Sequence, residues 1–265
     1  MKLADKAIVI TGAASGIGRG MAQRFAHEHP AGIMVSDLAS SQAALDSLVA
    51  ELRDQGVNAH AVAADVSRES DVIALVKAAR EHLGRVDVFA SNAGLIRDGD
   101  ENAPDNEWQL NWDVHVMAHV YAARAVVPEM VTRGEGYLLN TASAAGLLTS
   151  LPSATYAVSK HSAIALAEYL AIRHGDSGIR VSVLCPQAVA TPMIENRTGS
   201  SAAQVDGVMA VEELTEVVVR GIEAEDFLIL PHPEVYTYFG RKGQDYNRWL
   251  GGMRRFASKL GMGKN

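Results

Sequence analysis

The chain has 265 residues, of which 48% are hydrophobic and 21% are charged, as is typical of soluble globular proteins. No apolar run reaches the roughly 20 residues that cross a bilayer, and a formal net charge of −7 argues against nucleic acid as a partner. The single cysteine, Cys185, excludes an internal disulfide, and the first apolar stretch ends in Thr-Gly without a signal-peptide cleavage site. We therefore expect a cytoplasmic protein without a transmembrane segment.

Apolar stretches of strand length alternate with longer amphipathic stretches along the chain. The expected strands lie near residues 7–11, 32–37, 60–65, 85–91, 136–143, 179–185 and 226–231. The expected helices lie near residues 17–29, 41–55, 68–83, 107–131, 154–174 and 212–223. Apolar strands without polar alternation are typical of a parallel sheet that is covered on both faces. The pattern predicts an α/β fold with a doubly wound, mostly parallel seven-stranded sheet and helices on both faces.

No repeat, low-complexity tract or long linker divides the chain, so we expect residues 1–265 to form one domain. Residues 186–212 are expected to form a substrate loop, because they follow a strand end, where open α/β sheets bind ligands. Residues 232–260 are expected to form a C-terminal helical extension. From residue 232 onward the net charge is +5, from seven basic and two acidic residues, against −12 in the rest. We interpret this basic surface as a solvated helix face, with membrane-surface or partner binding as the alternative.

The extension also carries aromatic side chains, namely Tyr238, Tyr246, Trp249 and Phe256. Exposed together, they would form a large apolar patch. We therefore expect them to pack against the protein, with a cover over the substrate cleft or over a neighbouring subunit as the alternative.

A glycine cluster, TGAASGIG from Thr11 to Gly18, lies between the first expected strand and the first expected helix. Gly12, Gly16 and Gly18 permit a tight turn and let a pyrophosphate approach bare backbone at the positive end of a helix. Any turn from strand to helix favours glycine, so the cluster alone is weak evidence for a cofactor site. Its place in the first βαβ unit predicts a dinucleotide site that also includes Ser15 and Ile17.

An acidic residue, Asp37, ends the second expected strand 19 residues after Gly18. Its carboxylate can accept hydrogen bonds from both ribose hydroxyls of an adenosine and would repel a 2'-phosphate. Ser15 and Leu38, which flank these motifs, are not the basic residues that would neutralise such a phosphate. We expect NAD rather than NADP, although Arg19 in the first helix favours the opposite preference.

Tyr156 and Lys160 lie four residues apart in an expected helix, so they project from the same face. A cation beside a phenol lowers the pKa of the phenol and makes it a better proton acceptor at neutral pH. Such a pair arises easily by chance. Ser143, at the end of the fifth expected strand and 13 residues before Tyr156, adds a hydroxyl to the pair.

Taken with Asp65-Val66, Asn92-Ala93-Gly94 and YAVSK, these motifs make residues 4–193 closely resemble the short-chain dehydrogenase/reductase family. The resemblance implies a single-domain Rossmann fold, with Tyr156 as proton donor or acceptor, Ser143 orienting the substrate oxygen and Lys160 binding the nicotinamide ribose. It implies that Asn92 braces the sheet. The further cofactor contacts implied are Asp65, Val66, Ala93, Gly94, Tyr156, Pro186, Val189 and Thr191.

The chain departs from the family pattern at His115, where the family has a catalytic asparagine that holds a water for the proton relay. Histidine also donates and accepts hydrogen bonds, so we include His115 among the expected catalytic residues. Close to Lys160 it should be neutral, and its protonation at low pH should interrupt the relay. The alternative is a core residue. His119 lies one turn further, but without a third ligand nearby we expect no metal.

These features predict hydride transfer between NAD(H) and a secondary alcohol or ketone, with oxidation as the expected direction. A non-catalytic NAD sensor or scaffold is the alternative; a sugar-nucleotide epimerase would need another glycine spacing. A hydrophobic substrate is expected because the positions near the cleft are apolar, although each also fits plain packing. These positions, beside Ser143 and Tyr156, are Leu95, Ile96, Leu147, Leu151, Val189 and Met193. We expect a homodimer or homotetramer.

Overall fold

The computed structural model describes residues 1–195 and 206–262. The described residues contain one seven-stranded sheet at the centre of the fold. Its strands are β1 (Ala7–Thr11), β2 (Gly32–Asp37), β3 (Ala59–Ala63), β4 (Val88–Ser91), β5 (Gly136–Thr141), β6 (Ile179–Leu184) and β7 (Leu228–Ile229). They follow the order β3-β2-β1-β4-β5-β6-β7, and every pairing between them is parallel. The predicted fold class is confirmed. The strand order reverses between β1 and β4, and open sheets bind their ligands at such a switch point.

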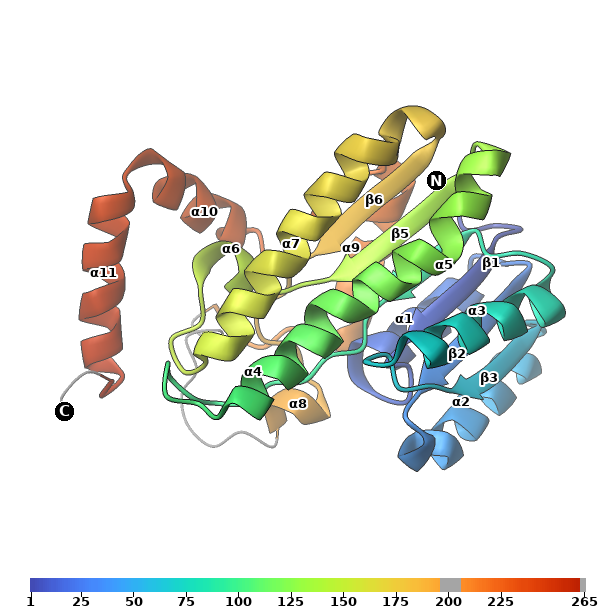
Figure 1. Cartoon of the computed structure of the whole chain (residues 1–265), viewed down its shortest axis with the longest axis horizontal. Helices are drawn as coiled ribbons and strands as arrows, with labels where there is room; N and C mark the ends of the chain where they lie inside the picture. The colour runs from blue at the N-terminus through green and yellow to red at the C-terminus, as the bar shows by residue number, and fades with distance from the viewer. Residues whose placement is uncertain (196–205, 263–265) are drawn as a thin grey trace.

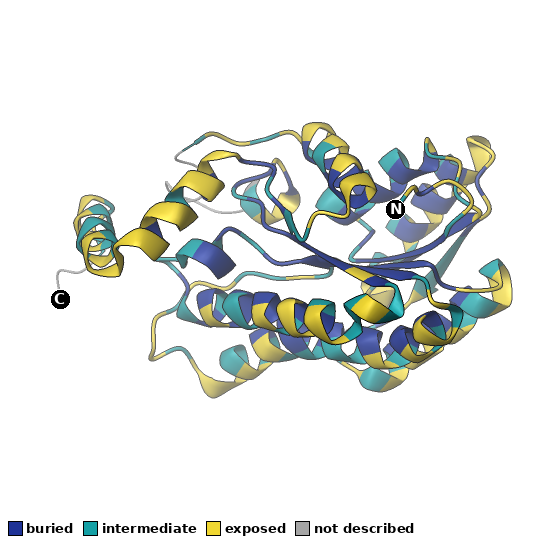
Figure 2. Ribbon diagram, turned by 90° about the horizontal axis from the view of Figure 1, so that it is seen from above, coloured by how far each residue is buried: buried dark blue, intermediate teal, exposed yellow. Residues whose placement is uncertain are grey.

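Helices cover both faces of the sheet, as the edge-on view shows (Figure 2). On one face, α1 (Gly16–Ala26), α2 (Gln42–Asp54) and α9 (Val211–Ala224) pack over a cluster that includes Ile8, Ile10 and Phe25. On the other, α3 (Glu69–Leu83), α5 (Ala118–Arg133) and α7 (Ala154–His174) pack over a cluster that includes Val9 and Phe89. Neighbouring residues of β1 thus enter opposite cores, which is why this strand is apolar throughout.

The expected helix at residues 107–131 is divided in the structure. It consists of α4 (Asp105–Trp112), a π-helical turn (Asp113–Met117) and α5 (Ala118–Arg133). A π turn inserts one extra residue per turn and rotates the following side chains about the helix axis. His115 lies inside this turn and is fully buried. Shorter helices, α6 (Ala145–Leu148) and α8 (Pro192–Glu195), follow β5 and β6.

The C-terminal extension forms two helices, α10 (Glu234–Gln244) and α11 (Tyr246–Lys259), at the end of the molecule away from β3 (Figure 1). Asp245 separates them with an extended backbone, φ −148° and ψ 91°, and its side chain accepts a hydrogen bond from the Arg248 N–H at 2.9 Å. No residue of α11 is buried in the described structure. Tyr246 is 54% exposed, so the expected packing of the aromatic residues is wrong for this side chain.

Residues 196–205 of the expected substrate loop lie outside the described residues. The described part of the loop contains α8 and a bridge between Val189 and Met209. Among the helices that the structure describes, none combines the length and the apolar character of a membrane span.

Candidate active site

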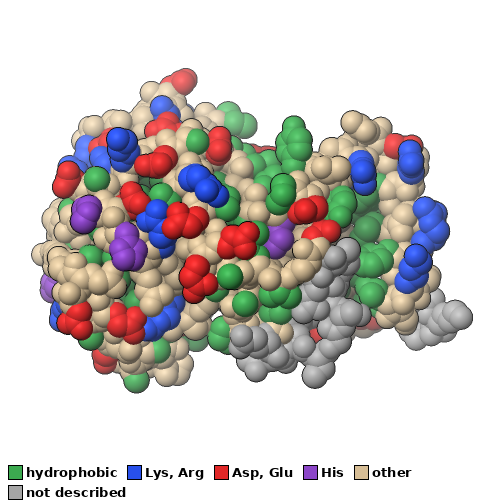
Figure 3. Space-filling model, turned by 180° about the vertical axis from the view of Figure 1, so that it is seen from behind, with side chains coloured by type: hydrophobic (Ala, Val, Ile, Leu, Met, Phe, Trp, Pro, Cys, Tyr) green, Lys and Arg blue, Asp and Glu red, His purple; other side chains and the backbone are tan. Residues whose placement is uncertain are grey.

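A cavity of about 1310 Å³ runs along the carboxyl ends of the strands, from the turn after β1 to α11. Seen from behind, hydrophobic side chains gather in the hollow between the main body and the C-terminal helices (Figure 3). The predicted cofactor and substrate residues that line it are Gly12, Ser15, Gly16, Ile17, Asp37, Leu38, Asp65, Val66, Asn92, Ala93, Gly94, Leu95, Ile96, Ser143, Leu151, Tyr156, Lys160, Pro186, Val189, Thr191 and Met193. Gly18, His115 and Leu147 are not among the lining residues.

The glycine loop brings bare backbone to the mouth of this cavity. Gly12 has a positive φ of 65°, and a Cβ there would lie 2.7 Å from the Ala93 Cα. A Cβ on Gly18 would lie 2.2 Å from the Gly12 carbonyl oxygen, so Gly18 serves the close packing of α1 on the loop and faces away from the cavity. The first turn of α1 contains no acidic residue. This cradle fits a pyrophosphate, because the free N–H groups and the positive helix end favour an anion.

Asp37 lies at the end of β2 on the cavity wall, with its carboxylate held by backbone. Its Oδ2 accepts the Ala14 N–H at 3.0 Å, and its Oδ1 accepts the Leu38 N–H at 2.8 Å. A carboxylate has further lone pairs, so both oxygens can still accept hydroxyl hydrogen bonds. Arg19, the residue that would favour a 2'-phosphate, is bonded to Glu51 and to the Ala44 carbonyl and is not among the residues that line the cavity.

Asn92 braces three strands beside the cofactor cradle. Its Nδ2 donates to the Thr11 carbonyl at 3.1 Å, and its Oδ1 accepts from the Thr141 hydroxyl at 3.1 Å. The Thr11 hydroxyl in turn accepts the Asn92 N–H at 3.0 Å. Sequence reasoning did not single out Thr11 or Thr141. Their place at strand ends, next to the glycine loop and Ser143, was the available signal.

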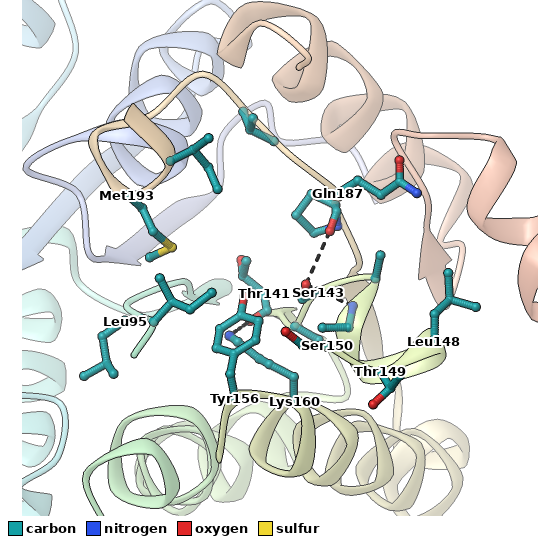
Figure 4. A pocket seen from close by; sticks show the side chains of 18 of the residues that line it. Leu95, Thr141, Ser143, Leu148, Thr149, Ser150, Tyr156, Lys160, Gln187 and Met193 are labelled. Carbon is teal, nitrogen blue, oxygen red and sulfur yellow. Dashed lines mark hydrogen bonds between the residues drawn. The ribbon is translucent and has the colours of Figure 1, made fainter. Parts of the chain in front are cut away.

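Tyr156, Lys160 and Ser143 lie around one part of the cavity (Figure 4). Ser153 caps α7 by accepting the Tyr156 N–H at 3.2 Å, which fixes the start of the helix. The Lys160 Nζ lies 5.6 Å from the centre of the Tyr156 ring and donates to the Thr141 carbonyl at 2.9 Å. The Ser143 Oγ accepts the Ala145 N–H at 3.1 Å.

Lys160 is almost completely buried, with 3% of its surface exposed. Burial disfavours the charged ammonium and lowers the pKa of Lys160 from 10.5 to about 7. The helix thus holds a cation that gains from any negative charge formed beside it. Lys160 and Tyr156 both line the cavity, so such a charge would develop within it.

His115 lies behind Tyr156, with the two rings edge to face and their centres 5.4 Å apart. Its Nε2 accepts the Leu95 N–H at 3.2 Å, so Nδ1 carries the proton and donates to the Ser159 Oγ at 2.9 Å. A Cβ on Gly94 would lie 3.5 Å from Nε2 and 3.7 Å from the Lys160 Nζ, so the imidazole and the ammonium both lie close to this glycine.

The surroundings of His115 oppose its protonation. Burial, the charge of Lys160 and the neighbouring His119 lower the pKa of His115 well below 6.5. The expectation of a neutral imidazole agrees with this environment. The expected interruption of the relay by protonation stays a prediction, and the lowered pKa moves it below the pH at which a free histidine titrates.

His119 lies one turn beyond His115 and is buried. Neither of its ring nitrogens has a hydrogen-bond partner among the described residues. Burial and the charge of Lys160 lower the pKa of His119 to about 3. The environment of the two histidines thus favours their neutral forms beneath α7.

One wall of the cavity corresponds to the alternative given for the C-terminal extension, a cover over the substrate cleft, whereas packing is the preferred expectation from the sequence. Residues of α10 and α11 and the Asp245 between them line this wall, namely Tyr238, Arg241, Gln244, Asp245, Arg248, Trp249, Gly252, Met253, Arg255 and Phe256. Leu148 also lines the cavity, whereas Leu147, the residue predicted for this role, is buried. The amphipathic pattern of the extension was a signal for a helix, but it did not say which surface the helix would face.

Comparisons with known proteins agree with this architecture. Residues 6–201 match the short chain dehydrogenase family. A 1-deoxy-11-beta-hydroxypentalenate dehydrogenase from Streptomyces exfoliatus is 34% identical over 238 residues, covering 88% of this chain and 86% of the relative.

Two solved structures show the same fold. A short chain dehydrogenase/reductase from Burkholderia phymatum in complex with NAD is 28% identical with a TM-score of 0.83, covering 93% of this chain and 95% of the other. A short-chain dehydrogenase from Sphingobium yanoikuyae in complex with NADPH is 27% identical with a TM-score of 0.77, covering 96% and 95%. The chain therefore belongs to the short-chain dehydrogenase/reductase family of oxidoreductases, whose members bind a nicotinamide cofactor.

Proposed function

We propose that the protein oxidises a secondary alcohol with an apolar skeleton to the ketone, and that NAD is its cofactor. The observation that carries this proposal is the placement of Ser143, Tyr156 and Lys160 in the same cavity as the glycine loop and Asp37. The name of the Streptomyces relative, a dehydrogenase of a hydroxy compound, supports the reaction class.

Tyr156 is the proposed proton acceptor. The nicotinamide of a dinucleotide bound at the glycine loop would supply the acceptor for the hydride of the carbinol carbon. Tyr156 takes the hydroxyl proton at its phenolic oxygen, while the Ser143 hydroxyl donates a hydrogen bond to the same substrate oxygen and orients it. Lys160 stabilises the phenolate before it accepts the proton, because an ammonium in a buried site interacts strongly with a nearby negative charge. Ketone reduction uses the same groups in reverse.

His115 supports this arrangement as a positioning residue. Its Nδ1 donates a hydrogen bond to the Ser159 hydroxyl, and that hydroxyl donates to the Tyr156 carbonyl at 3.2 Å. Its Nε2 also fixes the Leu95 N–H at the cavity wall. We propose that it holds Tyr156 and Leu95 in place as a neutral ring, in contrast to a group that gains and loses protons during turnover.

The preference for NAD rests on two side chains. Asp37 offers carboxylate oxygens to ribose hydroxyls and repels a 2'-phosphate. Arg19 cannot offset that repulsion while it is bonded to Glu51. Because the structural relatives include complexes with NAD and with NADPH, the cofactor preference has to be measured.

An oligomer is also proposed, formed through α7. Along its outer face, Val158, Tyr169 and Ile172 are 48%, 61% and 85% exposed. Their spacing of 11 and 3 residues puts them on one stripe of the helix. Light scattering of the wild type and of Ile172→Glu tests this: we expect a homodimer or homotetramer that the substitution weakens.

The activity is tested with a panel of secondary alcohols of increasing apolar size, each with NAD and with NADP, by the absorbance of the reduced nicotinamide. We expect turnover with NAD that rises with apolar size. Binding of NAD without turnover of any alcohol, or of any ketone with NADH, would support the non-catalytic sensor or scaffold instead.

A further inference from the structure

The outer wall of the cavity is one face of α11. Asp245, Trp249, Met253 and Phe256 recur at helical spacing and all line the cavity. This wall lies at one end of the molecule, apart from α1 and the glycine loop (Figure 1). Its residues are therefore placed to contact the substrate, and they lie far from a pyrophosphate at the start of α1.

A second row of α11 faces the same cavity and contains Arg248, Gly252 and Arg255. The two arginines are seven residues apart, or about 10 Å along the helix axis. Gly252 leaves the space between them open. The Arg255 guanidinium lies along this backbone, since a Cβ on Gly251 would lie 3.6 Å from Nη1 and one on Gly252 would lie 4.0 Å from Nη2.

Gly251 and Gly252 lie next to each other in the interior of α11. Glycine in a helix interior destabilises the helix relative to alanine, and α11 buries no residue of the described structure. The pair leaves room for the Arg255 guanidinium against the helix backbone, and Arg248 lines the cavity seven residues earlier. Arginine side chains at these two positions are long enough to reach one anionic group between them.

These guanidinium groups have no carboxylate partner within the described residues. On the main body, Arg24, Arg124 and Arg180 form ion pairs with glutamates. No ion pair between described residues involves an arginine of α10 or α11.

Two carboxylates line this end of the cavity, and both are engaged elsewhere. Asp206 accepts from the Gln187 side chain and from the Tyr238 hydroxyl, each at 3.0 Å. Asp245 caps α11. With Arg241, which also lines the cavity, three cations face two carboxylates in a chain whose net charge is −7.

We propose that Arg248 and Arg255 form a carboxylate subsite, so that the substrate is an apolar alcohol that carries a carboxylate group remote from the reacting carbon. Trp249, Met253 and Phe256 contact the apolar skeleton, and the arginines bind the carboxylate through paired N–H donors, as guanidinium groups do. This inference rests on the proposed function and adds the substrate class to it.

The test compares hydroxy acids with their methyl esters, which differ in charge at one end. The probes are 12-hydroxystearate and cholate with their methyl esters. Calorimetry of the NADH-loaded enzyme measures binding without turnover, because the reduced cofactor cannot accept a hydride from an alcohol. The variants are the double substitution Arg248→Ala with Arg255→Ala, and Arg254→Ala as the matched control, since Arg254 is an exposed arginine of the same helix that is not among the cavity-lining residues.

In the wild type and in Arg254→Ala, we expect at least one acid to bind tenfold or more tighter than its ester, because a charged hydrogen-bonded pair contributes about 1.5–3 kcal/mol. In the double variant the ratio should fall to about one while ester binding is unchanged. For any acid that is turned over, KM should rise and kcat should persist.

Equal binding of acid and ester in the wild type would overturn the proposal, as would no binding of either acid. An equal loss in Arg254→Ala, or a preference for acid that survives in the double variant, would also overturn it. If the proposed activity fails, the acid-to-ester ratio still reports on the subsite, so the two failures can be distinguished.

Discussion

The helices α7 and α11 lie on different sides of the same cavity and are held in different ways. Helix α7 buries residues from Thr155 to Leu170, and its Lys160 is bonded to the end of β5. Helix α11 buries none in the described structure and is joined to the rest through α10. At that joint, the Lys242 Nζ donates to the Leu147 carbonyl at 2.6 Å and lies 4.9 Å from the centre of the Trp249 ring. The residues of α7 proposed for the reaction are thus held by the packing of this helix into the core. The residues proposed for substrate selection are held by the contacts of Lys242 between α10, α11 and Leu147.

The largest effect is expected on the fixed side, from Tyr156→Phe. Removal of the proton acceptor should lower kcat by about 10³-fold, within the usual range for general acid–base groups, and should leave the Kd of NAD within a few fold. Stopped-flow turnover and calorimetric NAD binding measure the two quantities. Tyr169→Phe, an exposed tyrosine of the same helix, is the control. Parallel losses of turnover and NAD binding would contradict the role given to Tyr156.

The cofactor end of the fixed side is tested by Asp37→Ser combined with Leu38→Arg. Exchange of a repelling carboxylate for a phosphate-binding guanidinium should shift the ratio of kcat/KM for NADP over NAD by about 100-fold. Arg19→Ala should leave this ratio unchanged, because Arg19 is bonded to Glu51. A native preference for NADP would show that the role of Asp37 is misassigned.

The joint of α11 is tested by Lys242→Met, which keeps much of the side-chain volume and removes the bond to Leu147. We expect KM for the substrate to rise about tenfold, the loss of one charge-assisted hydrogen bond, with kcat within twofold. Lys259→Met, at an exposed position on α11, is the control. A fall in kcat at constant KM would show that Lys242 affects the chemical step. It would then contradict the distinction between a reacting side at α7 and a substrate-selecting side at α11.

The smallest effect concerns the histidines beneath α7. The pKa of His119 is about 3 in the folded protein and 6.5 when unperturbed, so the unfolded chain binds more protons between these values and stability falls as the pH is lowered from 6.5. The slope approaches about 1.4 kcal/mol per pH unit for each such histidine.

Urea unfolding at pH 7 and pH 5 measures this effect, and His119→Leu should lose less stability than the wild type across that interval. His115→Asn should leave the acidic limb of kcat/KM in place. If that substitution removes a limb near pH 6.5, His115 titrates during turnover and is more than a neutral support.

The sequence predicted the sheet and the cofactor end of the cavity because strand ends of a parallel sheet meet at one edge. Asp37, Asn92 and Ser143 follow three different strands, so topology alone brought them together. The prediction of substrate-lining residues depended on how each helix is rotated about its axis, which the hydrophobic periodicity of the sequence does not define closely enough. Leu147 and Leu148 differ by one residue, about 100° around a helix, and only Leu148 lines the cavity.

The π turn at Asp113–Met117 and the docking of α11 were likewise beyond local patterns. A π turn leaves almost no trace in hydrophobic periodicity. An amphipathic helix shows which of its faces is apolar but does not show the surface that this face meets.

Because α11 contributes nothing to the two hydrophobic cores, its sequence can drift at little cost in folding stability. If α11 selects the substrate as proposed, substitutions at its cavity-facing positions should change what is recognised and leave Ser143, Tyr156 and Lys160 where they are. This makes residues 246–259 an exchangeable module. Transplanting this segment between homologous enzymes is a direct route to altered substrate range, and directed evolution of this protein should concentrate its libraries there.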